Sequence, residues 1–167
     1  MSIQNSSKTV SVDFTKALAS MTSAPVVQLL NQCLADHYTL SAVALAAHWN
    51  IVSPTFGELH ELFGAVYETA DAHTDDLAER LRQVGSFVQV DLAAFQKSAG
   101  MTIPSAPQEC DTWMSAVVAG IDKSSANLQT FVAATDKMEL LMHQDLALAM
   151  LQTLSKHRWM LVSSMKG

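Results

Sequence analysis

Residues 26–53 contain neither proline nor glycine, and this run constrains the fold more than any other feature of the sequence. A helix over the whole run would be about 40 Å long. Apolar and small side chains recur within it at intervals of three and four, as expected of one buried helix face. The residues on this face are Leu29, Leu30, Cys33, Leu34, His37, Leu40, Ala44 and Ala47. Pro54 ends the run, so the sequence predicts a long helix that packs against other helices.

Three further runs with helical periodicity follow, at residues 57–84, 110–134 and 138–165. A short helix is expected at residues 91–98, in the long connection between the second and third runs. The four prolines and six glycines are too few and too widely spaced for a sandwich or barrel of strands. The sequence therefore predicts an all-α four-helix bundle with one extra short helix. Residues 1–20 are polar and without pattern, so a flexible tail is expected before a single domain at residues 21–167.

The composition excludes several other classes of protein. The formal net charge of −6 provides no basic surface for nucleic acid or an anionic membrane. The two cysteines, Cys33 and Cys110, form no Cys-x-x-Cys pair. This argues against a disulfide framework or a structural zinc site and favours a reducing compartment. No apolar segment is long enough for a signal peptide or a membrane span, so a cytoplasmic protein is expected.

The second long run separates into two faces when its residues are placed 100° apart around a helix. The face expected in the bundle core comprises Leu59, Leu62, Phe63, Val66, Ala70, His73, Leu77, Leu81 and Val84. The opposite face carries His60, Asp71, Asp75 and Glu79. Such a stripe is either a solvated polar face or a metal site. The carboxylates of Asp75 and Glu79 favour a metal, because at i, i+4 they repel each other unless a cation lies between them.

Helix geometry indicates how these residues could form one site. His60 and Asp75 are 15 residues apart, which is about 22 Å along a straight helix, so they cannot bind one ion within a single chain. An antiparallel copy packed across a two-fold axis would bring His60 level with the second subunit's Asp75 and Glu79. A mean hydropathy of +0.17 and nine methionines also predict apolar surface buried between subunits. The sequence therefore predicts a metal site shared between two subunits.

These residues belong to a longer pattern. It consists of His48-Trp49-Asn50, Phe56, Leu59-His60-Glu61, His73, Asp75, Glu79-Arg80, Gly85, Asp145 and Trp159-Met160-Leu161. The pattern resembles the mini-ferritins called Dps, the DNA-binding proteins of starved cells, over roughly residues 25–165. The resemblance implies a ferritin-like bundle and a hollow shell of twelve subunits. It also implies a ferroxidase that oxidises Fe(II), preferably with hydrogen peroxide, and stores ferric mineral inside the shell.

The resemblance also implies roles for individual residues. His48 and His60 of one subunit and Asp75 and Glu79 of its partner would bind a pair of iron ions, with Glu79 as the bridging ligand. Imidazole nitrogen and carboxylate oxygen are suitable ligands for Fe²⁺, and oxygen suits the harder Fe³⁺. Trp49 is similar to the family's tryptophan that takes up stray radical equivalents, although a core aromatic residue at a helix end is the alternative.

Two departures from the family pattern affect these expectations. The family commonly has an aspartate four residues after the second histidine, as a ligand for the second iron, and here that position is Gly64. Glu61 and Glu68 are possible compensating ligands, and zinc is a possible resting or inhibitory occupant.

The second departure concerns the three-fold pore for iron entry. Here the family usually has acidic residues, whereas this chain has Leu140, Leu141 and Met142. Negative potential at the pore would then come from Asp136, Glu139 and Asp145.

DNA binding is not expected, because residues 1–20 contain only Lys8 and Lys16 as basic residues and a shell multiplies the negative charge. The alternative function is a shell with a degraded second metal site, which protects or compacts DNA or buffers metal without turnover. The remaining histidines, His37, His73, His143 and His157, are interpreted mainly as packing residues.

Overall fold

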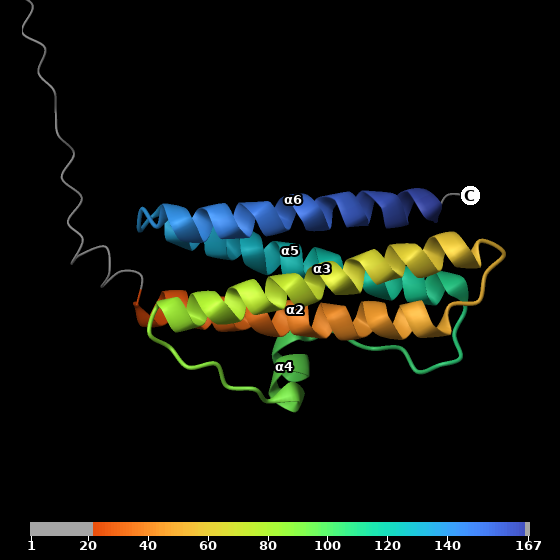
Figure 1. Cartoon of the computed structure of the whole chain (residues 1–167), viewed down its shortest axis with the longest axis horizontal. Coiled ribbons are helices and arrows are strands. Elements are labelled where there is room, and N and C mark those ends of the chain that lie inside the picture. The colour runs from red at the N-terminus through yellow and green to blue at the C-terminus, as the bar shows by residue number, and fades with distance from the viewer. Residues whose placement is uncertain (1–21, 166–167) are drawn as a thin grey trace, which may run out of the picture.

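A computed structural model describes residues 22–165 and contains helices but no strand in that range (Figure 1). Four long helices run side by side: α2 (Ala24–Asn50), α3 (Phe56–Gln83), α5 (Cys110–Asp136) and α6 (Leu141–Ser164). The short helix α4 (Leu92–Ala99) lies across the outside of α2. The predicted all-α bundle with a short helix between its second and third long helices is therefore confirmed. The tail predicted at residues 1–20 lies outside the described residues.

Helix ends differ from the predicted ones where the backbone turns without a glycine. α2 ends at Asn50 rather than at residue 53, and Ile51 is already extended, with φ −64° and ψ 131°. α6 begins at Leu141 rather than at residue 138, because Glu139 adopts a positive φ of 57° and reverses the chain. The Leu140 amide then donates to the carbonyl oxygen of Thr135 at 3.0 Å. By contrast, Gly85 ends α3 where the sequence predicted, with a φ of 81° that glycine adopts without strain.

The bundle core forms where the apolar faces of the long helices meet. α2 packs mainly against α3 and α5, and α5 packs against α6. Every residue predicted on the core face of the second long helix is buried: Leu59, Leu62, Phe63, Val66, Ala70, His73, Leu77, Leu81 and Val84. This burial fixes the rotation of α3 about its axis, so that Asp71, Asp75 and Glu79 are exposed.

Several large apolar side chains remain exposed on the single subunit. They include Trp49, Val52, Phe87, Val90 and Trp159, each about 70% exposed or more. Apolar surface of this kind is typical of proteins that associate. None of the helices within residues 22–165 is both long and apolar enough to cross a membrane.

Candidate metal centre

His48 and His60 lie against each other where the end of α2 meets the start of α3. Their rings are stacked, with centroids 3.6 Å apart and an angle of 23° between the ring planes. The Nδ1 atom of His48 is 2.7 Å from the carbonyl oxygen of His60, and the Nδ1 atom of His60 is 2.9 Å from the carbonyl oxygen of His48. The two side chains therefore fix each other through a reciprocal pair of hydrogen bonds.

These hydrogen bonds determine which nitrogen of each ring can bind a metal. A carbonyl oxygen only accepts, so Nδ1 carries the hydrogen in both rings and donates it. In the neutral ring, Nε2 then has a free lone pair. A metal-binding histidine is usually oriented in this way, with its other nitrogen donating to a carbonyl or a carboxylate. The pair thus presents two oriented Nε2 donors from a single subunit.

Two further aromatic rings contact the pair, one at each histidine. Phe56 stacks on His60 with centroids 5.0 Å apart, and Tyr67 meets His48 at 5.3 Å with an angle of 71° between the rings. Sequence analysis assigned no role to Tyr67. Its spacing could have indicated one, because it follows His60 by seven residues and so lies two helical turns further along the same face.

Gly64 lies beside this pair and is buried. A Cβ atom built on Gly64 would lie 3.5 Å from both Cε1 and Nδ1 of the His48 ring, which is ordinary van der Waals contact. The missing carboxylate of the family pattern would therefore have stood next to His48. Glu61 and Glu68 are exposed, and neither makes a hydrogen bond or an ion pair in the described part of the chain.

The structure does not bring Asp75 and Glu79 to the histidine pair within one subunit. Both are exposed on α3, and Asp75 is about 22 Å along the helix from His60. Within residues 22–165, no group of three or more His, Cys, Asp or Glu side chains could hold a metal ion. The described part of one chain thus brings together the two histidines of the predicted ligand set and leaves Asp75 and Glu79 apart from them. Trp49 is 70% exposed, so it is not a core aromatic residue of its own subunit.

The residues predicted at the pore lie around the α5–α6 turn and the start of α6. Asp136, Glu139 and Asp145 are exposed, and the Gln144 side-chain amide donates to Asp136 at 3.0 Å. Leu140 was predicted to line the pore, but it is only 5% exposed and packs into the core of its own subunit. The apolar side chains that remain available at this turn are Leu141 and Met142, which are 72% and 57% exposed.

The other four histidines are buried, in agreement with their interpretation as packing residues. His37 donates from Nδ1 to the carbonyl oxygen of Cys33 at 2.8 Å and meets the ring of His73 at 5.2 Å. Loss of solvation lowers the pKa of His37, His73 and His143 from 6.5 to about 4, and it also lowers the pKa of His157. These four histidines are therefore uncharged at neutral pH.

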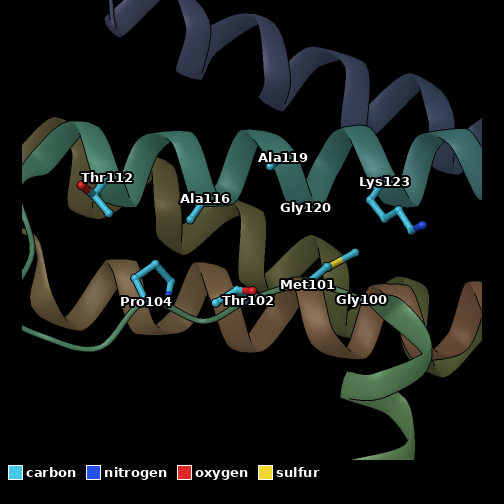
Figure 2. A pocket seen from close by; sticks show the side chains of 9 residues that line it. All are labelled: Gly100, Met101, Thr102, Pro104, Thr112, Ala116, Ala119, Gly120 and Lys123. Atoms are coloured by element: carbon cyan, nitrogen blue, oxygen red, sulfur yellow. The ribbon is translucent and has the colours of Figure 1, made fainter.

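A cavity of about 440 Å³ opens elsewhere, between α5 and the segment that follows α4 (Figure 2). Small and apolar groups such as Ala116, Gly120 and Pro104 line most of it, and Lys123 is the charged residue at one end. Its lining contains no histidine, cysteine or carboxylate. This cavity is therefore separate from the candidate metal centre.

Comparisons with known proteins agree with this fold. The family model described as a ferritin-like domain matches residues 27–166. A DNA protection during starvation protein from Brevibacillus brevis is 30% identical over 136 residues, which cover 81% of this chain and 91% of that protein. The crystal structure of a Dps protein from Bacillus brevis has a TM-score of 0.80 and 29% identity, and covers 87% of this chain and 97% of that one. A low temperature-induced protein from Nostoc is 38% identical over 87 residues, so the chain spans about half the length of that relative.

Proposed function

The chain belongs to the ferritin-like family and, within it, to the Dps proteins, and on that premise we propose that it is an iron-storing ferroxidase. Iron storage is the general function of this family of mini-ferritins. The proposed reaction oxidises Fe(II) at centres shared between two subunits and deposits the ferric product inside a hollow shell. Iron is a substrate of this reaction and becomes the stored product.

The observation that carries the proposal is the reciprocal hydrogen bonding of His48 and His60. These hydrogen bonds hold both rings through Nδ1 and leave both Nε2 atoms without a hydrogen bond, so a metal would meet two nitrogen donors that are already oriented. Asp75 and Glu79 of the partner subunit would complete the ligand set. Each is exposed on the face of α3 that points away from the core, where a second copy can reach the histidine pair.

The chemistry proposed for this site balances with hydrogen peroxide as the oxidant. Each of two Fe(II) ions gives up one electron, and the O–O bond of peroxide breaks as it takes up both electrons and two protons to form two waters. The imidazole nitrogens hold Fe(II), and the carboxylate oxygens stabilise Fe(III) as it forms. Trp49, which is exposed and adjacent to His48, is the proposed acceptor for radical equivalents that escape this two-electron reaction.

Iron entry is proposed to follow the acidic side chains near the start of α6. Asp136, Glu139 and Asp145 give this region a negative potential that raises the local concentration of Fe(II). The exposed apolar side chains of Leu141 and Met142 make the entry less polar than acidic residues would.

The test adds Fe(II) without oxygen, then hydrogen peroxide, and follows ferric absorbance. The protein should accelerate its appearance over buffer, and Asp75→Asn should reduce the initial rate by about tenfold or more, because a ligand is lost. Asp76→Asn is the matched control, since Asp76 is the exposed neighbour on the same helix and has no role in the proposed site. No acceleration by the parent protein, or equal rates for Asp75→Asn and Asp76→Asn, would refute the proposal.

The name of the Brevibacillus brevis relative, a DNA protection during starvation protein, supports a second candidate function, protection of DNA. In this alternative, the carboxylate missing at Gly64 leaves the second metal site degraded. The shell would then cover DNA or buffer metal without oxidising Fe(II). A gel-shift experiment at low salt tests the DNA version directly. Because the net charge is −6 per chain, we expect DNA to migrate freely with excess protein, and retarded DNA would support the second candidate.

A further inference from the structure

The ring of Tyr67 borders the space that Gly64 leaves beside His48. A Cβ atom built on Gly64 would lie 3.5 Å from both Cε1 and Nδ1 of His48 and 4.0 Å from Cε1 of Tyr67. Gly64 has no side chain, so atoms of both rings border the same position. Gly64 and Tyr67 are three residues apart on α3, which places them on one face of the helix.

In both rings, a potential metal-ligand atom lies close to the Cε1 atom that borders Gly64. Cε1 of His48 is bonded to Nε2, the nitrogen that the His60 hydrogen bond leaves free. Cε1 of Tyr67 is bonded to the carbon that carries the hydroxyl group. The Tyr67 hydroxyl makes no hydrogen bond within residues 22–165, and the ring is only half-buried. A nitrogen donor and an oxygen donor thus border the position where the family's carboxylate would stand.

We propose that Tyr67 supplies the oxygen ligand that Gly64 lacks, and that its phenolate binds the second iron as Fe(III) together with Nε2 of His48. This inference rests on the proposed function, which supplies the iron. The phenol releases one proton to solvent as its oxygen bonds to the metal, and no electron is transferred in that step. A bound cation favours the deprotonated form of an oxygen ligand, and Fe³⁺ prefers oxygen to softer donors.

A phenolate ligand gives the second site a preference for the oxidised ion. Tyrosine also binds ferric iron as the axial ligand of the haem in catalases. Because the phenolate stabilises Fe(III) more than Fe(II), the second ion is bound weakly as Fe(II) and more tightly once it has been oxidised.

The test uses the visible charge-transfer absorption that an iron(III)–phenolate bond produces. The chain has two tyrosines, so the band can be assigned with two single variants. Tyr67→Phe removes only the hydroxyl group and keeps the ring against His48. Tyr38→Phe is the matched control, because Tyr38 packs on Phe95 of α4, with centroids 5.4 Å apart, and takes no part in the proposed site.

Ferric nitrilotriacetate is titrated directly into the full-length protein, so that band formation does not depend on catalysis. The parent and Tyr38→Phe should develop the band, and Tyr67→Phe should lose it. A parent without the band, or a Tyr67→Phe variant that retains it, would overturn the inference. A parent that shows the band but fails to oxidise Fe(II) would instead refute the ferroxidase function and leave Tyr67 as a ligand.

Discussion

The buried histidines predict that the bundle loses stability in mild acid. Burial lowers the pKa of His37 and His143 from 6.5 to about 4. Between these two pH values, the unfolded chain therefore binds protons that the folded chain does not bind. A group whose folded pKa is lowered contributes stability above pH 6.5, and that stability is lost as the pH falls toward 4. Integrating between pH 7.5 and pH 5 gives a loss of about 2 kcal/mol for each of these two residues.

Asp36 works in the opposite direction and offsets part of this loss. Burial raises the pKa of its carboxyl to about 6, against the hydrogen bonds from Asn127 and Gln32 that lower it. A raised folded pKa contributes stability at low pH, and for Asp36 this amounts to about 1 kcal/mol at pH 5. The net loss from His37, His143 and Asp36 is therefore about 3 kcal/mol, and His73 and His157 add to it. A typical domain has a total stability of about 5–15 kcal/mol, so the effect is large.

Urea denaturation followed by circular dichroism measures this effect at pH 7.5 and pH 5, with protein concentration and salt held constant. His143→Leu is the informative variant, because neither ring nitrogen of His143 makes a hydrogen bond and its ring packs beside Phe131. We expect the variant to lose about 2 kcal/mol of the pH dependence. A parent stability that is equal or higher at pH 5, or a variant with unchanged pH dependence, would show that the histidines are not buried as described.

Three further predictions concern single residues. Gly64→Asp should tighten binding of the second Fe(II) by about tenfold or more, because it restores a carboxylate beside His48 in a space that accepts a Cβ. Anaerobic titration measures this, and unchanged stoichiometry and affinity would contradict it. Leu77→Ala should cost about 2–5 kcal/mol by leaving a cavity where a fully buried side chain stood, and a thermal midpoint equal to that of the parent would contradict it. Asp145→Asn should slow iron uptake several-fold at low salt and little at high salt, whereas a difference independent of salt would exclude electrostatic attraction.

Local periodicity predicted the parts of the fold that depend on neighbouring residues alone. The core face of α3, from Leu59 to Leu81, repeats every three or four residues, and its burial follows from that repeat. The start of α6 was placed three residues early, because Glu139 adopts a positive φ without the glycine or asparagine that usually indicates one. Asp36 was missed altogether. Gln32 lies one turn before it on α2, but Asn127 comes from α5, and only the packing of the two helices brings Asn127 to Asp36.

In the candidate site, too, the sequence predicted what depends on one helix and missed what depends on how two helices pack. The separation of His60 from Asp75 along one helix follows from helix rise, so the sequence could predict that the two side chains do not meet within one chain. The reciprocal hydrogen bonds of His48 and His60 depend on the angle at which α2 and α3 meet across residues 51–55, and a linear sequence does not specify that angle. The contact between Tyr67 and His48 has the same origin.

Complementation between two inactive variants tests the shared centre most directly. His48→Ala/His60→Ala removes one half of the proposed site, and Asp75→Asn/Glu79→Gln removes the other. Size-exclusion chromatography and circular dichroism establish that each variant folds and assembles. When the two are coexpressed in equal amounts, half of the subunit pairs are mixed, and each mixed pair has one intact centre of two. We predict about a quarter of the parental peroxide-dependent rate from mixed shells, whereas mixed shells no more active than the separate variants would contradict a centre built from two subunits.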